Sequence, residues 1–390
     1  MAMHLLPALF GAFAVSHAAA QQGKSPEPQL VVTEQFRLTG ATEATPFGRI
    51  DCIAAMPDGG VALFDGKGID GPTLLILDAQ GKLRRHLGRR GAGPGEYSSS
   101  QLLDCITVTP EGTIALFDRG LSRITRWARD GKLLPTVSVP VQASGFPPYL
   151  VAVRDGSFYV HSLVSRPAPG LVFDGAAYGY IHLDATGTIL DTLRPAALAQ
   201  RKQGHLIGDP FVYWFPRPDG SVVEADEATL GYRIRDVRGI WHPVSHPFTV
   251  LPFSSAERAE EAASQEWTAL MTRGAVPARE LATNKPAFGR IMSDPESRVW
   301  LLRRVPSVPG TPRPDQGPVS IGTTQRPVRR MSEPPVFVRF SATGKYEGEV
   351  RIPLESAWGN FFVAIGNTVW STGASSDGEP QVIKWRVEMP

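Results

Sequence analysis

Three things are scarce in this sequence: net charge, long apolar runs and clusters of metal-binding side chains. The 390 residues carry 40 basic and 38 acidic side chains, a formal net charge of +2. This balance gives no overall field that would concentrate nucleic acid or an anionic membrane on the surface. Beyond residue 20, no apolar run approaches the roughly eighteen residues that a membrane-spanning helix needs. We therefore expect neither a nucleic-acid partner nor a membrane span.

Histidine and cysteine are too few and too scattered to indicate a metal centre. The chain has 8 His and 2 Cys. The one close pair of histidines, His242 and His246, lies in extended, proline-interrupted chain, where residues four apart are about 13 Å from each other. No His-Glu-x-x-His, Gly-x-Ser-x-Gly or Cys-x-x-Cys motif occurs. The sequence predicts no metal, no cofactor and no catalytic residue.

The first twenty residues have the pattern of a secretory signal peptide. A short apolar run at 5–15 precedes a cleavage site of the A-x-A type at 16–20, although the segment before the run lacks Lys and Arg. No Cys follows the site, so a lipid anchor is not expected. We predict a signal peptide at 1–20, a linker at 21–29, and a secreted or periplasmic protein.

Glycine and proline are abundant, with 39 and 35 copies, and they mark an internal repeat. Residues 51–65 match 104–118 position by position: an apolar strand, a turn of Asp or Glu followed by Gly, and a second apolar strand. This pattern is typical of a β-hairpin. The same turn recurs at 154–157, 218–221, 295–298 and 365–368, which makes six copies.

A second apolar strand that runs into another turn follows each copy, for example at 124–131 and 232–239. Two hairpins per repeat make four strands, and four-stranded sheets at this spacing are typical of β-propeller blades. The sixth copy has only three strands, while residues 30–38 alternate apolar and polar side chains at the start of the chain. We predict an all-β, six-bladed β-propeller at 30–390, whose ring is closed by the N-terminal strand.

The second repeat resembles a known family. Residues 115–118 and 122–127, followed by Asp130-Gly131-Lys132, are similar to an NHL-type propeller repeat. Residues 88–97 resemble the Gly-Pro-Gly-Glu loop of exported, largely uncharacterised bacterial six-bladed propellers of the NHL-like superfamily. The resemblance covers about 30–390 and weakens in repeats three to five. It implies the fold but no single activity, because such scaffolds host lyases, lactonases and binding modules.

Two insertions interrupt the repeats. Residues 254–271 predict a helix, capped by Ser254 and ended by Gly274, within an insertion at 254–283 between blades 4 and 5. Its apolar side chains on one face are Ala259, Ala263, Trp267 and Leu270. We expect this helix to pack over one end of the propeller, with a lid over a pocket as the alternative. The second insertion, 304–335, is rich in Pro and Arg, and we expect it to be a flexible loop.

The loop at 88–97 contains four of the candidate ligand-binding residues: Arg89, Arg90, Glu96 and Tyr97. Its glycines allow positive φ and a close approach of the backbone to a partner. Neither a Gly-Lys-Ser/Thr ending nor a following helix is present, which disfavours a phosphate-binding loop. Two interpretations stay open: an inter-blade turn in which Glu96 satisfies backbone N–H groups, or a site where the two arginines meet an anionic group.

Aspartates at repeated positions supply the other candidates. Asp51 and Asp104 open the innermost strands of blades 1 and 2, where they either bind a cation near the central channel or are solvated rim residues. Asp65, Asp118 and Asp226 end second strands, and this repetition favours a structural role within their turns.

The two cysteines also occupy equivalent positions. Cys52 and Cys105 lie on the inner strands of adjacent blades, which we expect to be about 10 Å apart, beyond the reach of a disulfide. The sequence therefore predicts two separate buried thiols, unless the inner strands converge near the channel.

Binding is the function that these features favour. We predict an exported, monomeric module that binds a small molecule or a protein or peptide at the ends of the propeller. The alternative is an NHL-like enzyme, a lyase or hydrolase that acts on a small molecule at the channel mouth. That alternative requires His and carboxylate side chains from several blades to converge, and only Asp51 and Asp104 hint at such a cluster.

Overall fold

Strands make up nearly all of the regular structure of the chain. The computed structural model describes residues 28–40, 47–66, 73–98, 106–140, 150–164, 178–193, 212–274, 279–310, 320–321, 324–354, 361–375 and 377–388. The predicted signal peptide at 1–20 and most of the linker lie outside these residues. Within the described ranges, no helix has the length and apolar character that crossing a membrane requires.

The strands form antiparallel sheets of four, in chain order. Unit 1 contains β2 (Ile50–Ala55), β3 (Val61–Asp65), β4 (Thr73–Leu77) and β5 (Leu83–Leu87). Unit 2 contains β8 (Ile106–Val108), β9 (Ile114–Asp118), β10 (Arg123–Trp127) and β11 (Leu133–Ser138). Unit 3 contains β12 (Leu150–Ala152), β13 (Phe158–Leu163), β14 (Tyr178–Leu183) and β15 (Ile189–Leu193). Unit 4 contains β16 (Val212–Pro216), β17 (Val222–Asp226), β18 (Gly231–Arg235) and β19 (Trp241–Ser245).

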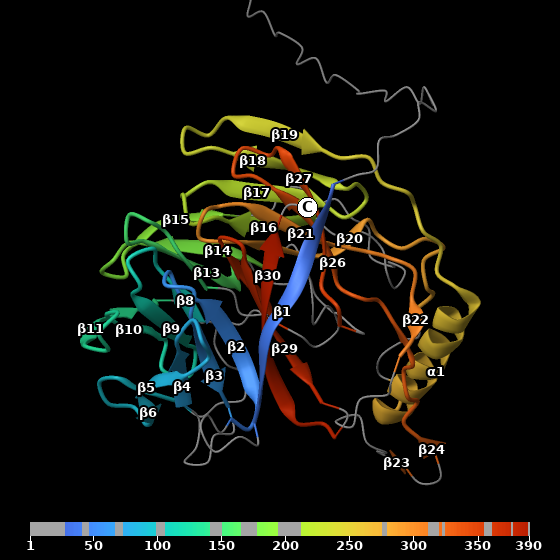
Figure 1. The fold of residues 1–390 in the computed structure, drawn as a ribbon, viewed down its shortest axis with the longest axis horizontal. Coiled ribbons are helices and arrows are strands. Elements are labelled where there is room, and N and C mark those ends of the chain that lie inside the picture. Colours follow the sequence, from blue (N-terminus) through green and yellow to red (C-terminus); the bar gives the residue numbers. More distant parts are fainter. Residues whose placement is uncertain are drawn as a thin grey trace, which may run out of the picture.

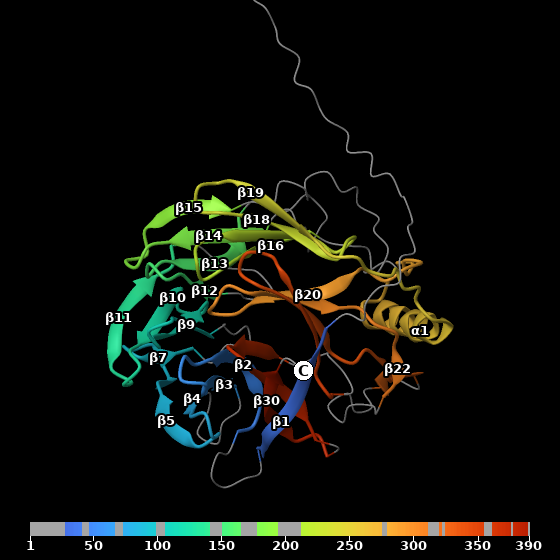
Figure 2. The same ribbon diagram turned by 45° about the horizontal axis from the view of Figure 1, so that its top comes forward.

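The remaining large sheet has eight strands and consists of two halves. Unit 5 contains β20 (Phe288–Ser293), β21 (Val299–Arg303), β26 (Val336–Phe340) and β27 (Tyr346–Arg351). Unit 6 contains β28 (Phe362–Ile365), β29 (Thr368–Ala374), β30 (Pro380–Glu388) and β1 (Gln29–Thr39). A short parallel pairing of β1 with β27 joins the two halves. In Figure 2 the units follow one another around a common centre, from blue through green and yellow to red.

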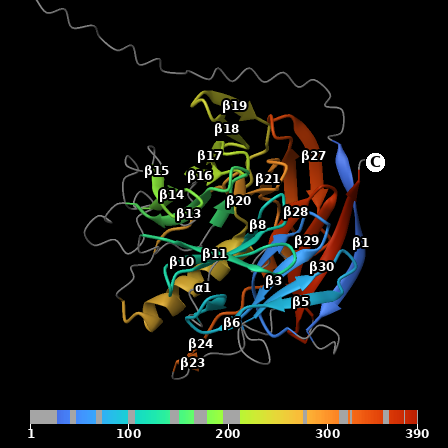
Figure 3. The same cartoon turned by 90° about the vertical axis from the view of Figure 1, so that its left-hand side faces the viewer.

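The first strand of the sheet structure pairs with the last. β1 runs antiparallel to β30, from Val31 opposite Glu388 to Thr39 opposite Gln381, and Figures 1 and 3 show the two strands side by side. Unit 6 also contacts unit 1: Trp370 Nε1 donates to the Gly59 carbonyl at 3.3 Å. Residues 30–38 therefore belong to one sheet with the three C-terminal strands.

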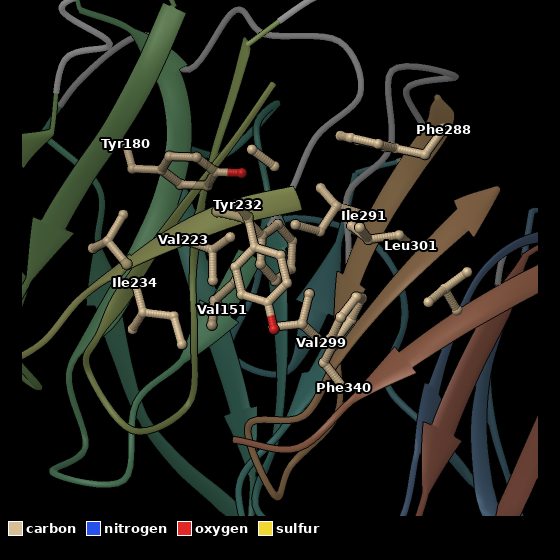
Figure 4. Close-up of a cluster of buried hydrophobic side chains, with 14 of the residues drawn as sticks. Val151, Tyr180, Val223, Tyr232, Ile234, Phe288, Ile291, Val299, Leu301 and Phe340 are labelled. Atoms are coloured by element: carbon tan, nitrogen blue, oxygen red, sulfur yellow. The ribbon is translucent and has the colours of Figure 1, made fainter. Parts of the chain in front are cut away.

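The core lies between neighbouring units. One hydrophobic cluster joins units 3, 4 and 5, and Figure 4 shows its aliphatic side chains around Tyr180 and Tyr232. The Tyr232 ring meets Phe340 of unit 5 edge to face at 5.2 Å. Face-to-face contact between consecutive sheets is the packing expected of a β-propeller.

Tight turns at one end of the units adopt the backbone that the repeat predicted. The same turn position has positive φ in Gly59, Gly112, Gly156 and Gly220, with φ values of 81° to 88°. In unit 5 that position is Ser297, which adopts φ 62° although it carries a side chain. Ser297 thus has the positive φ that L-residues rarely adopt, although the other units have glycine at this position. Contacts with neighbouring residues must therefore hold the turn.

Side-chain donors connect these turns from unit to unit. Arg217 of unit 4 donates through Nη1 to the carbonyls of Ser297 and Ala342 in unit 5, both at 2.8 Å. Arg298 of unit 5 donates to Gly366 of unit 6 at 2.8 Å, and Lys384 of unit 6 donates to Ala79 of unit 1. We call this side of the molecule the tight-turn end. Its hydrogen bonds stabilise the arrangement of the units rather than any single sheet.

The predicted helix is present as α1 (Ser255–Met271), and Ser254 and Glu257 form a capping box at its start. Its contacts differ from the expectation. None of its residues is buried, and Leu270 on the predicted apolar face is 50% exposed. The helix is held through carboxylates instead: Glu257 lies 2.6 Å from the buried Lys285 ammonium. Figure 2 shows α1 outside the ring of sheets, so it does not cover the centre as a lid would.

The described residues of the insertion at 304–335 include short strands, and the flexibility of the segment as a whole stays a prediction. β22 (Val308–Pro309) pairs with β25 (Met331–Ser332), and a short hairpin joins β23 (Ser320–Ile321) to β24 (Thr324–Gln325). The Glu333 carboxylate forms an ion pair with Arg304 at 2.7 Å and a second ion pair with Lys285. Ion pairs of Glu333 therefore hold the described residues that flank β22 and β25.

Candidate functional site

Second strands end, and third strands begin, at the end of each unit opposite the tight-turn end. In an antiparallel meander, alternate connections lie at the same end of the sheet. The first-to-second and third-to-fourth strand connections are short turns. The connections that start from this end include α1 and the described parts of the insertion at 304–335. We call this side the long-connection end, and the sequence-predicted site residues that the structure describes all lie there.

The loop at 88–97 is locked by its own side chains. It runs between the short parallel strands β6 (Arg89–Arg90) and β7 (Glu96–Tyr97). Glu96 accepts from Gly93 N at 2.7 Å and from Arg89 Nε at 2.8 Å, and the pKa of its carboxyl is lowered by these two contacts in that order. Arg123 of unit 2 donates to three loop carbonyls, at 2.7 to 3.1 Å. The loop is therefore rigid.

The four candidates of this loop divide into two pairs. Tyr97 is fully buried, its hydroxyl accepts from Leu74 N and donates to the Leu87 carbonyl, and burial raises its pKa to about 12. Together with Glu96 it holds the loop. The side chain of Arg89 is 82% exposed despite its contact with Glu96, and Arg90 is exposed as well. Of the four, only the arginines are presented to a partner.

Asp51 occupies a β-bulge at the start of β2, where the register with β3 shifts between Ile50 and Cys52. Bulges re-aim a side chain and are frequent beside functional sites. Both carboxylate oxygens of Asp51 accept from Arg49, at 2.6 and 2.8 Å. The charge of Asp51 is therefore already paired. Its predicted partner, Asp104, lies outside the described residues, and within them no group of three His, Cys, Asp or Glu side chains is placed to hold a metal ion.

Asp65 and Asp118 have a structural role, but not within their own turns alone. Asp65 accepts from the backbone N–H groups of Gly48 and Arg49, both at 2.8 Å. Asp118 accepts in the same way from Ser98 N at 2.6 Å. Each fully buried aspartate thus fixes the chain segment that leads to an inner strand. The third member, Asp226, accepts from Ala228 N within its turn.

The thiol of Cys52 lies closer to the next unit than we expected. It is buried, and its Sγ accepts from the backbone N of Ile106 at 3.3 Å. The expected gap of about 10 Å between inner strands is therefore too large at this height, because β2 and β8 converge toward the centre. Cys105 itself lies outside the described residues.

One Ser-His-Asp array, missed by the sequence analysis, comes together at the tight-turn end of unit 3. Ser157 Oγ lies 2.8 Å from His182 Nε2, and His182 Nδ1 lies 3.4 Å from Asp191 Oδ1. No motif could reveal it, because the three residues come from a turn and from β14 and β15. Their distances match the order of a nucleophile, a base and an orienting carboxylate.

The hydrogen bond between Ser157 and His182 has the opposite direction to the one in a hydrolase. Ser157 Oγ also lies 2.6 Å from Asp155 Oδ1; burial opposes ionisation of Asp155, but contacts from Ser157 outweigh it and lower the pKa. The single hydroxyl proton is thus donated to Asp155, so His182 must donate to Ser157 rather than accept from it. Ser221 repeats the bond to its own turn aspartate, Asp219, in unit 4. The array is a turn-stabilising chain.

Comparison with known proteins shows likeness at the level of the fold. No family model and no curated protein sequence matches the chain. Among solved structures it is similar to a member of the DUF4221 family from Bacteroides vulgatus, with a TM-score of 0.56 and 10% identity over 94% of this chain and 100% of that one. It is also similar to a streptogramin B lyase, with a TM-score of 0.41 and 14% identity over 92% and 98%. A putative gluconolactonase gives a TM-score of 0.40 and 12% identity over 90% and 92%.

The four-stranded antiparallel sheets of this chain, arranged around a common centre, are consistent with a β-propeller fold. Identities this low establish no activity, because one propeller scaffold hosts unrelated functions. The function has to be argued from the side chains of this chain.

Proposed function

We propose that the six units are the blades of a closed propeller of the NHL-like superfamily, with β1 as the outer strand of the sixth blade. In this proposal the protein is an exported, monomeric binding module, and it recognises its ligand with the long-connection end. The pairing of β1 with β30 and the contacts of unit 6 with unit 1 support the closure.

The difference between the two ends is the observation that carries the binding function. Side chains that donate to turn carbonyls occupy the tight-turn end, whereas the long-connection end presents Arg89 and Arg90 on a rigid loop. A rigid loop reduces the entropy lost on binding. Exposed guanidinium groups suit a ligand with a carboxylate or another anionic group. The direction of the Ser157 hydrogen bond favours binding over hydrolysis.

Export is tested by the intact mass of the protein recovered from the periplasm or the medium. The proposal expects a chain that begins after Ala20. A mature protein that still carries Met1 would contradict it.

Binding at the loop is tested by calorimetric titration with citrate as an anionic probe. We expect Arg90→Glu to weaken citrate binding by about tenfold or more, the loss that corresponds to one charge-assisted hydrogen bond. The control is Arg238→Glu, at another exposed arginine, which lies at the tight-turn end; this variant should bind citrate as the unaltered protein does. Equal losses in both variants, or no citrate binding, would overturn recognition of anions by this loop.

A further inference from the structure

Basic side chains are concentrated in units 1 and 2. Residues 82–132 contain ten Lys and Arg residues against five Asp and Glu residues, a formal charge of +5 in a chain whose total is +2. This segment runs from the start of β5 to the last turn of unit 2, and Figure 2 shows β5 and β11 on the outside of the ring. An anionic partner is attracted to this side of the molecule rather than to the rest of its surface.

Cations from the two units meet at the start of β5. Arg84 and Arg129 of unit 2 both bond to Asp58, at 2.5 and 3.4 Å. Arg85 of β5 donates to the carbonyl of Asp130, in the same turn as Arg129. The side chain of Asp58 is only 15% exposed, whereas those of Arg84 and Arg129 are 43% and 59% exposed. One covered carboxylate is thus shared by two guanidinium groups, which leaves positive charge at this surface.

A second group of cations lies just beyond the end of β5. Arg89 and Arg90 follow this strand in the chain, on the rigid loop of the proposed anion site. The strand between the two groups has five residues, a length of about 16 Å, so one small anion such as citrate cannot meet both groups. A ligand that does so must be extended and carry several negative charges. We call this surface the basic strip; it consists of Arg84, Arg85, Arg89, Arg90 and Arg129.

The backbone of β5 has an open edge between these two groups. Among the described residues β5 pairs only with β4, so no strand lies along its other edge. β11, β15 and β19 are also outer strands with a free edge. However, β11 and β19 contain Pro135 and Pro243, which lack a backbone N–H for a further strand, and β15 carries Asp191. Among these outer strands, β5 is the one that combines a proline-free edge with basic side chains.

The charges on β5 select the kind of strand that can pair with it. Charged side chains on an edge strand ordinarily keep other strands away. β5 carries Arg84 and Arg85 and no acidic residue, so its charges attract an acidic segment. A peptide can also pair its backbone N–H and C=O groups with the strand edge. An acidic polysaccharide lacks these groups, and the open edge therefore favours a peptide.

We infer that the basic strip binds an acidic peptide segment of a partner protein, which lies extended along the free edge of β5. The inference rests on the proposed recognition of anions by Arg89 and Arg90 and extends it. Carboxylates at one end of the segment bind this loop, and carboxylates about five residues away bind Arg84 and Arg129. Contact at both ends makes the peptide a tighter ligand than either end alone.

The test is calorimetric titration of the mature protein with decaglutamate, and with citrate as the short anion. We expect decaglutamate to bind at least tenfold more tightly than citrate. Arg129→Glu should weaken decaglutamate binding by about tenfold and leave citrate binding unchanged, because only the peptide reaches this residue. The control is Arg238→Glu, also at an exposed arginine of a third-to-fourth turn, which should change neither affinity.

Two further measurements separate a peptide from other polyanions. Decagalacturonate carries ten carboxylates on a sugar chain without amide groups, and we expect it to bind at least tenfold more weakly than decaglutamate. Hydrogen exchange should show that backbone amides of β5 gain protection when decaglutamate binds, while those of β15 do not. Equal affinity for decagalacturonate, or unchanged protection of β5, would overturn the pairing of a peptide with this strand.

The citrate titration separates failure of this inference from failure of the proposed function. If citrate binds and decaglutamate binds no more tightly, the peptide inference is wrong and anion recognition by the loop stands. If neither binds, both are wrong. Arg129 is exposed, so the thermal midpoint of Arg129→Glu should stay near that of the unaltered protein. Decaglutamate binding that this folded variant leaves unchanged would exclude the basic strip as the binding surface.

Discussion

Arginine has different roles at the two ends of this molecule. At the tight-turn end, Arg217 is only 3% exposed and spends its guanidinium on carbonyl groups of the next unit. At the long-connection end, Arg89 and Arg90 are exposed on a loop that Arg123 holds from below. The number of arginines at one end therefore does not show whether they stabilise the fold or bind a ligand. What the guanidinium faces, a backbone carbonyl or solvent, decides whether it stabilises the fold or is free to bind.

The repeat makes this contrast sharper. The residue that opens the first turn is Met56 in unit 1 and Val153 in unit 3, but Arg217 in unit 4 and Asp294 in unit 5, and all four are buried. Asp294 accepts from Trp300 Nε1 at 3.0 Å, and burial raises its pKa. Charged side chains have thus replaced apolar ones at one position of the repeat. Buried ion pairs contribute little net stability, so they serve better to fix which units become neighbours.

The strongest test of the comparison removes the strand that joins the two termini. A chain that begins at residue 41 lacks β1 and leaves β30 as an exposed edge. We expect aggregation, or a thermal midpoint lower by roughly 10 °C or more. A chain that begins at residue 28 is the control and should melt like the mature protein. Equal midpoints for both truncations would contradict a stabilising role of β1.

The next test removes the buried guanidinium of the tight-turn end. Arg217→Met leaves two turn carbonyls of unit 5 and the carboxylate of Asp219 without their donor. We expect a loss of about 3 kcal/mol in the free energy of unfolding, measured by urea denaturation. Arg238→Met, at an exposed arginine of the same end, should change stability by less than about 0.5 kcal/mol. Similar small losses in both would show that the links between turns are not stabilising.

Acid should loosen the attachment of α1. Burial opposes ionisation of Glu257, but its contacts with Lys285 and Ser307 outweigh that effect and lower its pKa from 4.5 to about 2. A carboxyl with a lowered pKa in the folded state stabilises fully above its unfolded pKa and loses this stabilisation as pH falls toward the folded value. We expect α1 to lose hydrogen-exchange protection, corrected for intrinsic rates, between about pH 4.5 and pH 2. Glu257→Gln should abolish this pH dependence in α1, while protection of β17 stays constant in both proteins.

The smallest effect is expected at the exposed arginine of the loop. Arg90→Ala should leave the free energy of unfolding unchanged within about 0.5 kcal/mol, since the residue is exposed. Arg123→Ala, which removes the donors of three loop carbonyls, should cost about 1–2 kcal/mol in the same urea experiment. A larger loss for Arg90 than for Arg123 would reverse the assignment of which arginine holds the loop.

The sequence predicted the strands better than the contacts of the insertions. Turns with Asp-Gly or Glu-Gly recur at fixed positions and specify backbone angles locally, so the hairpins and the start of α1 at Ser254 could be read directly. The docking of α1 through Glu257 and Lys285 could not, because it joins residues on different segments.

The candidate site shows the same limit. Arg89 and Glu96 were identified together because they share one loop, and the structure shows Glu96 bonding both to Arg89 and to the backbone N of Gly93. The pairing of Asp51 with Arg49 was missed, although the two are close in sequence, because the bulge that aligns them has no local signature.

The pairing of β1 with β30 also sets the order of events during folding. Val32 pairs with Val387, and almost the whole length of the chain lies between these two residues. Contacts this distant along the chain form slowly, because the entropy of closing the intervening loop is lost before they contribute. β1 therefore remains unpaired, and its backbone N–H and C=O groups have no strand partner, until β30 is in place. The chain is therefore most prone to aggregation during folding, before β1 pairs with β30.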